Sequence, residues 1–394
     1  MATKKKKRRK KTKIITFKAL FSICAFLFAC FIIIGSFLYL SNYLVTASPP
    51  LFEEIYSVST DLNKKIGRID HAIYESLYQR GIDERNVFFS TVSPRHEKGH
   101  DWDFTELLIK LPDREASFQL EKIIDVELDE LRPDLIINKE KISEHEIVYH
   151  VHALDLYTHK IRLVSSGYEK IAGETLPKIA IIIDDIGYDY NLALSFMDYD
   201  LPLTLSVLPL APYTSDIVDS ANETGSELLL HLPMEPKDYP RLDPGPGALL
   251  TTMGEKELRR IISENIKKVP GLRGVNNHMG SFFTEKYDKM RTVLEEIKKH
   301  GLFYVDSRTT NRTIAFELAQ KMGVPAAKKS VFLDNDLSGE AIRYQLERLM
   351  GMARYSGEAV GIGHPHRETL EILYEYLDKL KTDFRVVPVS ELVR

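Results

Sequence analysis

Side chains that can bind a cation or move a proton stand directly after several apolar runs of this sequence. Asp184 and Asp185 follow the aliphatic run 179–183. Two adjacent carboxylates repel each other unless a cation or a proton lies between them. A divalent cation held by one carboxylate lowers the pKa of its bound water, and the other carboxylate can then accept the proton. The pair therefore suggests metal-assisted hydrolysis, although as an isolated motif Asp185 could equally cap a helix.

Four further apolar runs end in the same way. His231 follows one of them directly, and Glu235 comes four residues later, in a stretch whose two prolines exclude a regular helix. The other three runs are followed by Asn277 with His278, by Asp306 with Ser307 and Arg308, and by His364. Each has a structural alternative, because a histidine can belong to the core and Asp306 can form a structural salt bridge. Five such strand ends together favour a single functional site.

From residue 177 onward, short apolar stretches alternate with amphipathic ones. The expected strands are apolar on both faces, which is typical of a parallel sheet covered by helices. Seven or eight such units in about 218 residues predict a (β/α)7–8 barrel, complete or distorted, rather than two small domains. The chemistry of such folds collects where the carboxyl ends of the strands meet. The fold therefore predicts that the five polar strand ends lie together.

These motifs resemble those of the polysaccharide deacetylase superfamily, the NodB-type carbohydrate esterases, and most closely its divergent branch. The resemblance covers residues 177–393, slightly over half of the chain, and rests on the stretches "IIDDIG", "HLPMEP", "NNHMGS" and "IGH". It implies a distorted barrel of the deacetylase type, with Asp184 as the catalytic base and Asp185 as a metal ligand. It also implies that His364 is the general acid and that Asp306 supports the base.

The sequence departs from the usual family pattern at two of these stretches. Glu235 stands where the second metal-binding histidine of the family belongs, while His231 keeps the place of the first. "NNHMGS" lacks the arginine and the proline of the third motif and supplies His278, which can complete the metal site. The predicted metal ligands are Asp185, His231, His278 and Glu235, and the predicted substrate groove includes Asn277 and Arg308. Carboxylate and imidazole ligands suit a divalent metal, with zinc favoured.

Together these observations predict a metal-dependent hydrolase that deacetylates an N-acetylated polysaccharide or cell-wall glycan. The departures from the family pattern leave a second hypothesis open, a catalytically inactive or altered envelope protein that binds glycan or acts as a scaffold on the same fold. Peptide or ester cleavage at the same residues is a third hypothesis. The Pro/Gly-rich stretch 238–251 is expected either to shape specificity beside the site or to serve only as a connector.

The first 40 residues predict a membrane anchor. Residues 1–18 carry ten Lys or Arg and no acidic residue, and residues 19–40 carry no charge. A run of this length spans a hydrocarbon core of roughly 30 Å, and the basic tail keeps the N-terminus in the cytoplasm. An uncleaved anchor is favoured over a signal peptide, whose apolar core is usually about 7–15 residues long. The body is then expected on the periplasmic or cell-wall side of the cytoplasmic membrane.

The rest of the chain differs in charge from its basic tail. Beyond residue 18 it holds 43 basic and 57 acidic residues, a net charge of −14, which argues against nucleic acid as a partner. The two cysteines lie in the predicted anchor, so the body has no disulfide or thiol chemistry. Residues 51–166 predict a small α+β accessory domain, with an envelope protein as its possible partner. His150 and His152 share a strand face there, but a structural role is favoured over metal binding because no third ligand is suitably spaced.

Overall fold

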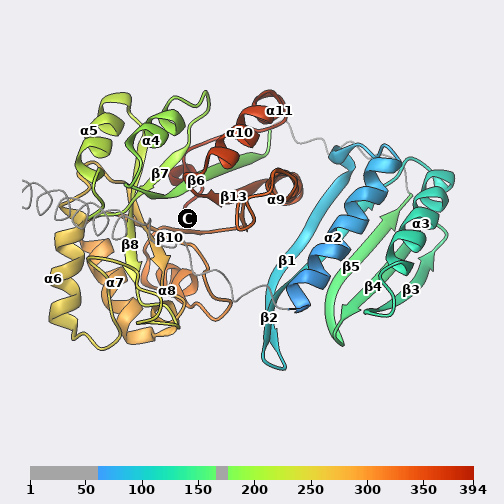
Figure 1. Ribbon diagram of the computed structural model, residues 1–394, viewed down its shortest axis with the longest axis horizontal. Coiled ribbons are helices and arrows are strands. Elements are labelled where there is room, and N and C mark those ends of the chain that lie inside the picture. The colour runs from blue at the N-terminus through green and yellow to red at the C-terminus, as the bar shows by residue number, and fades with distance from the viewer. Residues whose placement is uncertain (1–60, 166–175) are drawn as a thin grey trace, which may run out of the picture. The chain divides into compact units, whose positions relative to one another are not determined.

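The computed structural model describes residues 61–165 and 176–394 (Figure 1). The predicted basic tail, residues 1–18, and the predicted anchor, residues 19–40, lie outside these ranges. Within the described ranges, the helices are all too short or too polar to cross a membrane. The described residues belong to one compact unit, and their strands form two β-sheets.

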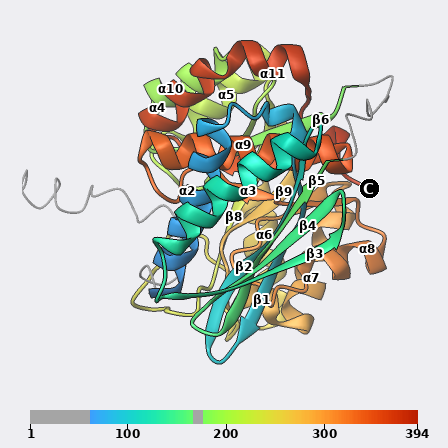
Figure 2. The same cartoon turned by 90° about the vertical axis from the view of Figure 1, so that its right-hand side faces the viewer.

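The first sheet has five strands, with two helices packed on one of its faces (Figure 2). Its elements are α2 (Asp61–Gln79), η1 (Glu84–Asn86), β1 (Val87–Glu97), β2 (His100–Lys110), α3 (Arg114–Asp129), β3 (Leu135–Ser143), β4 (Glu146–Ala153) and β5 (Leu156–Val164). The strand order is β1-β2-β5-β4-β3, and β2 and β5 pair in parallel. His150 and His152 of β4 both contact Tyr157, the first through a 2.6 Å hydrogen bond and the second by ring stacking. Both histidines therefore pack against Tyr157 within the first sheet, as expected for a structural role.

The second sheet is parallel throughout, and its helices lie outside it (Figure 1). Its strands are β6 (Lys178–Ile186), β7 (Thr204–Val207), β8 (Glu227–Met234), β9 (Gly274–Met279), β10 (Phe303–Asp306), β11 (Ala326–Lys328), β12 (Val331–Phe332), β13 (Glu358–Gly363) and β14 (Arg385–Val386). Its helices are α4 (Tyr190–Met197), α5 (Thr214–Thr224), α6 (Glu255–Ile266), η2 (Phe283–Glu285), α7 (Tyr287–Lys299), α8 (Ala315–Met322), α9 (Gly339–Ser356), α10 (Arg367–Glu375), α11 (Leu377–Asp383) and η3 (Val389–Glu391).

The order of this sheet explains its barrel-like form. The strands follow one another as β11-β10-β9-β8-β7-β6-β13-β12, with β14 beside β6. The two edge strands, β11 and β12, are separated in the chain by Lys329 and Ser330 alone. These two strands do not pair with each other, so the sheet stays open between them, and only the short connecting segment crosses this gap. The predicted α/β fold is confirmed in its distorted, incompletely closed form.

Apolar side chains pack on both sides of this sheet, and each strand alternates between the two. Ile181 and Ile183 of β6 belong to the large core between the sheet and its helices. Ala180 and Ile182 belong to a second core inside the barrel, together with Val305 of β10. Each fully buried aliphatic side chain contributes about 1.5–3 kcal/mol to stability. Because strand side chains alternate in direction, this division also tells which residues at each strand end face the interior.

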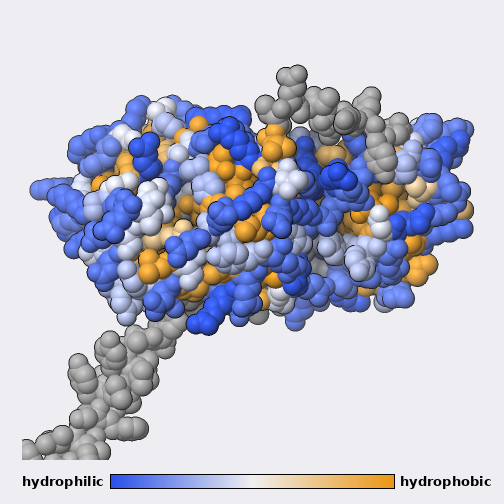
Figure 3. Space-filling model, turned by 90° about the horizontal axis from the view of Figure 1, so that it is seen from above, coloured by the Kyte–Doolittle hydropathy of each residue, from blue (hydrophilic) through white to orange (hydrophobic). Residues whose placement is uncertain are grey.

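The surface has a different character from these two cores. The face shown in Figure 3 is mainly hydrophilic, with hydrophobic residues in separate patches. Singly scattered apolar residues are usual on a protein surface. The informative groups are therefore the polar side chains that the fold buries, and many of these lie in the strands of the second sheet or directly after them.

Candidate metal centre

The two adjacent carboxylates stand where β6 ends. Asp184 continues the even-numbered, inward-facing series of this strand, so simple alternation would turn Asp185 toward the helices. Asp185 instead has a left-handed backbone with φ of 54°, and the pairing with β7 shifts register between Ile183 and Ile186. A left-handed backbone is costly for a residue other than glycine and is found where a functional site requires it. Both carboxylates are completely buried.

Two histidines from neighbouring strands meet Asp185. His231 of β8 and His278 of β9 place Nε2 and Nδ1 at 3.0 and 2.9 Å from Asp185 Oδ1. The two ring nitrogens are 3.2 Å apart, and both histidines are buried. Ligand atoms of the three residues all lie within 4.8 Å of one another. Within residues 61–165 and 176–394, no other group of three His, Cys, Asp or Glu residues meets this criterion.

The two carboxyl groups differ in their pKa. Burial raises the pKa of Asp184, and the neighbouring charge of Asp185 adds to that increase. Burial acts on Asp185 too, but His278 and His231 outweigh it and hold the pKa of Asp185 well below its usual value. Two carboxyl groups whose surroundings move their pKa values apart are typical of a proton acceptor beside an ionised group.

Asn276 connects the two halves of this cluster. Its Nδ2 donates a 2.7 Å hydrogen bond to Asp184 Oδ1. Its Oδ1 accepts hydrogen bonds from His231 Nδ1 at 2.9 Å and from Ser206 Oγ at 2.6 Å. Asn276 thus orients a carboxylate and an imidazole at once. Sequence reasoning missed it, although it stands two residues before His278 and therefore faces the same side of β9.

The polar atoms of the cluster fit a divalent cation. Both oxygens of Asp185 and Oδ2 of Asp184 have no hydrogen-bond partner among the described residues, and a buried carboxylate without partners is costly. Because His231 Nδ1 donates its proton to Asn276, a neutral His231 ring points its Nε2 lone pair at the anionic Asp185. A cation between the two removes this repulsion. One carboxylate and two imidazoles are also a ligand set of catalytic zinc sites, so these residues would hold the metal.

We expect the Asn276→Ala variant to bind a divalent metal about 10- to 100-fold more weakly, the usual cost of losing a residue that orients a metal ligand. A competition titration against a chromophoric zinc chelator measures this change. Ser206→Ala is the matched control, since it removes a hydrogen bond to Asn276 but none to the cluster itself. Equal affinities of wild type and Asn276→Ala would show that Asn276 does not position His231.

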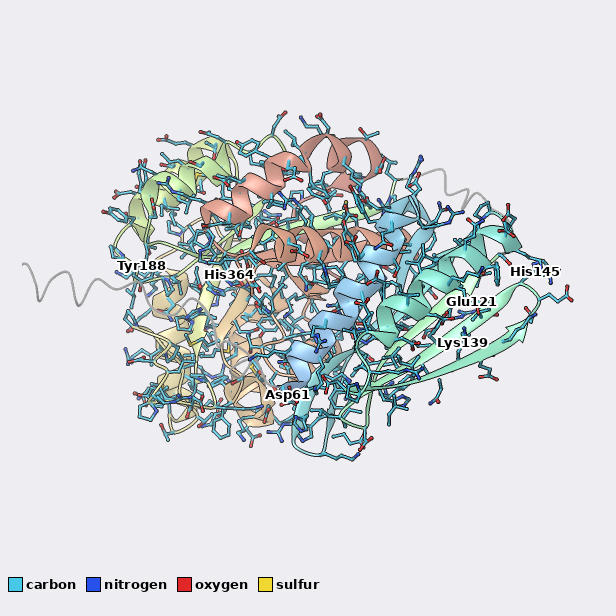
Figure 4. The ribbon with its side chains drawn as sticks, turned by 45° about the vertical axis from the view of Figure 1, so that its right-hand side comes forward. Asp61, Glu121, Lys139, His145, Tyr188 and His364 are labelled. Atoms are coloured by element: carbon cyan, nitrogen blue, oxygen red, sulfur yellow. The ribbon has the colours of Figure 1, made fainter. Side chains whose placement is uncertain are left out.

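His364 and Asp334 form a second buried pair. His364, labelled in Figure 4, follows β13, the strand hydrogen-bonded to β6. Asp334 Oδ1 lies 2.7 Å from His364 Nδ1, and Asp334 Oδ2 accepts from the His364 backbone N–H at 2.7 Å and from the Thr369 hydroxyl at 2.6 Å. Burial raises the pKa of Asp334, but His364 outweighs it and lowers the pKa of Asp334 overall. An ionised Asp334 at Nδ1 makes Nε2 the nitrogen of His364 that exchanges a proton.

The comparison with known protein families agrees with this geometry. Residues 181–393 match the model of the family described as divergent polysaccharide deacetylase, and they include every residue of the cluster. The chain belongs to this family.

Relatives of this divergent deacetylase family are found in several bacteria. The chain is 34% identical to the uncharacterized protein YibQ of Escherichia coli over 216 residues, which cover 55% of this chain and 67% of that protein. It is 30% identical to an uncharacterized protein of Haemophilus influenzae over 217 residues, 55% of this chain and 77% of the other. A crystal structure of an uncharacterized protein from Agrobacterium tumefaciens has 25% identity and a TM-score of 0.53, and the match covers 56% of this chain and 91% of that one.

Of the residues that the family resemblance singled out, Glu235 lies apart from the cluster. Its carboxylate accepts a hydrogen bond from the backbone N–H of Thr251. It therefore fastens the end of the Pro/Gly-rich loop 238–251 to the segment that follows β8. The structure places His278, and not Glu235, beside Asp185 and His231.

Asn277 and Asp306 face away from the barrel interior. Asn277 Oδ1 accepts hydrogen bonds from the Tyr304 hydroxyl at 2.9 Å and the Ser307 backbone at 3.0 Å, which does not place it in a groove. Asp306 accepts hydrogen bonds from Thr313 Oγ1 at 2.9 Å and from the Phe316 backbone at 3.1 Å. The hydrogen bonds of Asp306 do not include Asp184, the residue that it was predicted to support, and they hold the start of α8.

We expect Asp306→Asn to destabilise the protein by about 2 kcal/mol, because an amide N–H would then face donors that now bind a buried carboxylate. Urea unfolding followed by circular dichroism measures this loss. Activity per folded molecule is expected to stay within about twofold, the range in which transition-state contacts are unaffected. A variant with native stability and a hundredfold lower kcat would return Asp306 to the catalytic site.

Proposed function

We propose that this chain is a metal-dependent hydrolase that removes acetyl groups from an N-acetylated glycan. The observation that carries the proposal is Asp184, a buried carboxyl group with a raised pKa whose Oδ2 has no hydrogen-bond partner among the described residues. It adjoins a three-residue cluster that fits a cation. A base beside a cation site is the arrangement that hydrolysis of an amide requires.

The chain's own residues have separate tasks in this reaction. Asp184 accepts the proton of the attacking water at Oδ2, because Asn276 already holds Oδ1. His364 donates a proton from Nε2 to the nitrogen of the leaving amine, because Asp334 already holds Nδ1. The ionised Asp334 stabilises the protonated imidazole before that transfer. Base and acid therefore come from β6 and β13, two strands that pair side by side.

Asp185, His231 and His278 would hold the metal, for which two imidazoles and one carboxylate favour zinc. When bound, such an ion acidifies a water molecule and polarises the acetamide carbonyl. Asn276 keeps His231 in the tautomer that presents Nε2 to the ion. Burial of the whole cluster excludes bulk water, which strengthens each electrostatic interaction in the site.

Acetate release from N-acetylated chitooligosaccharides tests the proposed function. The zinc-loaded protein should release acetate, and Asp184→Asn should lower kcat by about 10²–10⁴-fold, the usual contribution of a general base. A zinc-loaded, folded wild type that releases no acetate from neutral or acidic N-acetylated glycans would contradict the proposal. A cellular role that survives Asp184→Asn would instead favour the second hypothesis, a glycan-binding or scaffold protein of the envelope.

We further propose that this reaction takes place outside the cytoplasm. The proposal rests on the uncharged stretch 19–40 and the basic tail before it, which lie outside the described residues. Fusion of a periplasmic reporter enzyme to the C-terminus tests this placement. Activity of a reporter that works only in the cytoplasm would contradict it.

A further inference from the structure

A polar cavity of about 200 Å³ lies among residues of both sheets. On one side it is lined by residues of α2, β1 and β2, and on the other by β12, by residues that follow β10, β11 and β12, and by α9. The side chains that matter here are Trp102, Asp103, Arg308, Lys329, Phe332 and Arg348. We call it the Arg348 cavity. Its two sides are joined by a 2.8 Å hydrogen bond from Asn311 Nδ2 to the backbone oxygen of Arg95.

Arg348 is the unusual member of this lining. It belongs to α9, and its side chain is nine-tenths buried, with 10% of it exposed. Its Nε and one of its terminal nitrogens have no hydrogen-bond partner among the described residues. The carboxylate of Asp103 lies 3.9 Å away, too far for a hydrogen bond, and is itself largely exposed. A buried guanidinium with unsatisfied donors is costly, which indicates that an anion completes it.

Charged side chains of both signs line the cavity. The charged residues of its lining are three cations, Arg308, Lys329 and Arg348, and two acids, Asp101 and Asp103. Asp101 already binds His96 at 2.7 Å. Arg308 and Lys329 have interactions within the protein, and the charge of Arg348 also acts on the buried Asp70, so the unsatisfied donors of Arg348 mark the place of a ligand. A carboxylate suits these donors because it forms two parallel hydrogen bonds with a guanidinium group.

The cavity adjoins the proton donor of the candidate site. Phe332 lines the cavity, and its ring stacks on that of His364 with centroids 6.0 Å apart. Lys329 Nζ lies 2.9 Å from the centre of the same Phe332 ring. Phe332 therefore links the lining of the cavity to His364 of the candidate site.

We propose that the Arg348 cavity binds a carboxylate carried by the glycan substrate, next to the sugar that is deacetylated. This inference rests on the proposed deacetylase function and adds the chemical class of the substrate, an acidic N-acetylated glycan. Arg348 forms the paired hydrogen bonds to the carboxylate, and Lys329 and Arg308 add positive charge. Trp102, which is 5% exposed and belongs to the core of the first sheet, forms part of the rigid wall of the cavity.

Two disaccharides of similar size test the proposal on the full chain, zinc-loaded and purified in detergent. N-acetylglucosaminyl-N-acetylmuramic acid carries one carboxylate, and N,N′-diacetylchitobiose carries none. The wild type should prefer the acidic disaccharide in kcat/KM. Arg348→Gln should reduce the ratio of the two kcat/KM values at least about tenfold, the fold-change expected for one lost charge-assisted hydrogen bond.

Arg343→Gln is the matched control for loss of a positive charge. It lies on the same helix, outside the cavity lining, and pairs at 2.8 Å with Glu375. It should leave the ratio unchanged. Arg348→Lys keeps the charge without the planar fork and should restore part of the preference. If Arg348→Gln does not fold, Lys329→Gln carries the same test, with the same direction of change.

The outcomes separate this inference from the proposed function. Acetate release from both disaccharides at a ratio that Arg348→Gln and Lys329→Gln leave unchanged overturns the acidic subsite and leaves the deacetylase intact. If neither disaccharide loses acetate, calorimetric binding decides: tighter binding of the acidic disaccharide that Arg348→Gln abolishes supports the subsite alone. Inorganic phosphate that binds as tightly as the acidic disaccharide, and is also lost in Arg348→Gln, would assign the cavity to a free anion and overturn the glycan assignment.

Discussion

Asp185→Asn is expected to lower the affinity for zinc by more than about 100-fold. Substitution of a residue that only orients a metal ligand usually lowers metal affinity by about 10- to 100-fold, and loss of a ligand should exceed this. The substitution keeps the shape of the side chain but removes the one negative charge that the three ligands share. It also places an amide N–H toward His231 Nε2 or His278 Nδ1, which now lie 3.0 and 2.9 Å from a carboxylate oxygen. Isothermal titration of the metal-stripped protein with zinc measures the change, and acetate release should fall in parallel.

Glu235→Gln provides the matched control for that experiment. It removes a carboxylate that the family pattern suggests as a ligand but that binds the backbone of Thr251 in the structure. Glutamine keeps an acceptor oxygen for this hydrogen bond, so zinc affinity should be unchanged. If Glu235→Gln weakened zinc as strongly as Asp185→Asn, the ligand set would have to include Glu235, and the loop 238–251 would have to rearrange when metal binds.

The position of the site could be predicted from the sequence because it depends on a general property of parallel sheets. Apolar runs that end in Asp184, His231, His278 and His364 are visible without a structure, and parallel order brings their carboxyl ends to one edge. What such runs do not show directly is which of two adjacent polar residues faces the interior. The side to which a residue points depends on the register of its strand. The choice of site residues from the family motifs did not consider this register at β9 and β10.

Alternation would have resolved both cases. On β9, His278 faces inward, so Asn276 also faces inward and Asn277 faces the helices. On β10, Val305 belongs to the interior core, so Asp306 belongs to the outer side, where it binds the start of α8. The same rule fails at β6, where the left-handed backbone of Asp185 brings two consecutive side chains to one cluster. Tertiary structure imposes this backbone conformation, and the apolar run 179–183 before it in the sequence does not predict it.

Asp334 was missed for another reason. It follows β12, a strand of two residues, which is too short to give a periodic apolar pattern. Its importance is visible only from its contacts, which fix both the backbone and the ring of His364. In the proposed mechanism, the carboxylate that orients a catalytic side chain is therefore Asp334, which contacts His364, whereas the family resemblance placed this role at Asp306.

Asp334→Asn is accordingly expected to lower kcat for acetate release by about 10²-fold or more, within the range that general acid catalysis contributes. The neutral amide cannot stabilise a protonated His364, so the imidazole would lose its proton at lower pH. The alkaline limb of the kcat profile should therefore move toward lower pH, while zinc affinity stays unchanged because Asp334 touches none of the ligands.

These two readouts distinguish a positioning role from a merely structural one. A structural defect would lower the fraction of active molecules without moving the pH profile, whereas loss of the Asp334 charge moves the profile in every folded molecule. Thr369→Ala removes a 2.6 Å hydrogen bond to the same carboxylate but keeps its charge, so it should affect kcat less and leave the alkaline limb nearly in place. An alkaline limb that is identical in wild type and Asp334→Asn would show that His364 is not the group that donates the proton, and would leave the leaving amine without an acid from this pair.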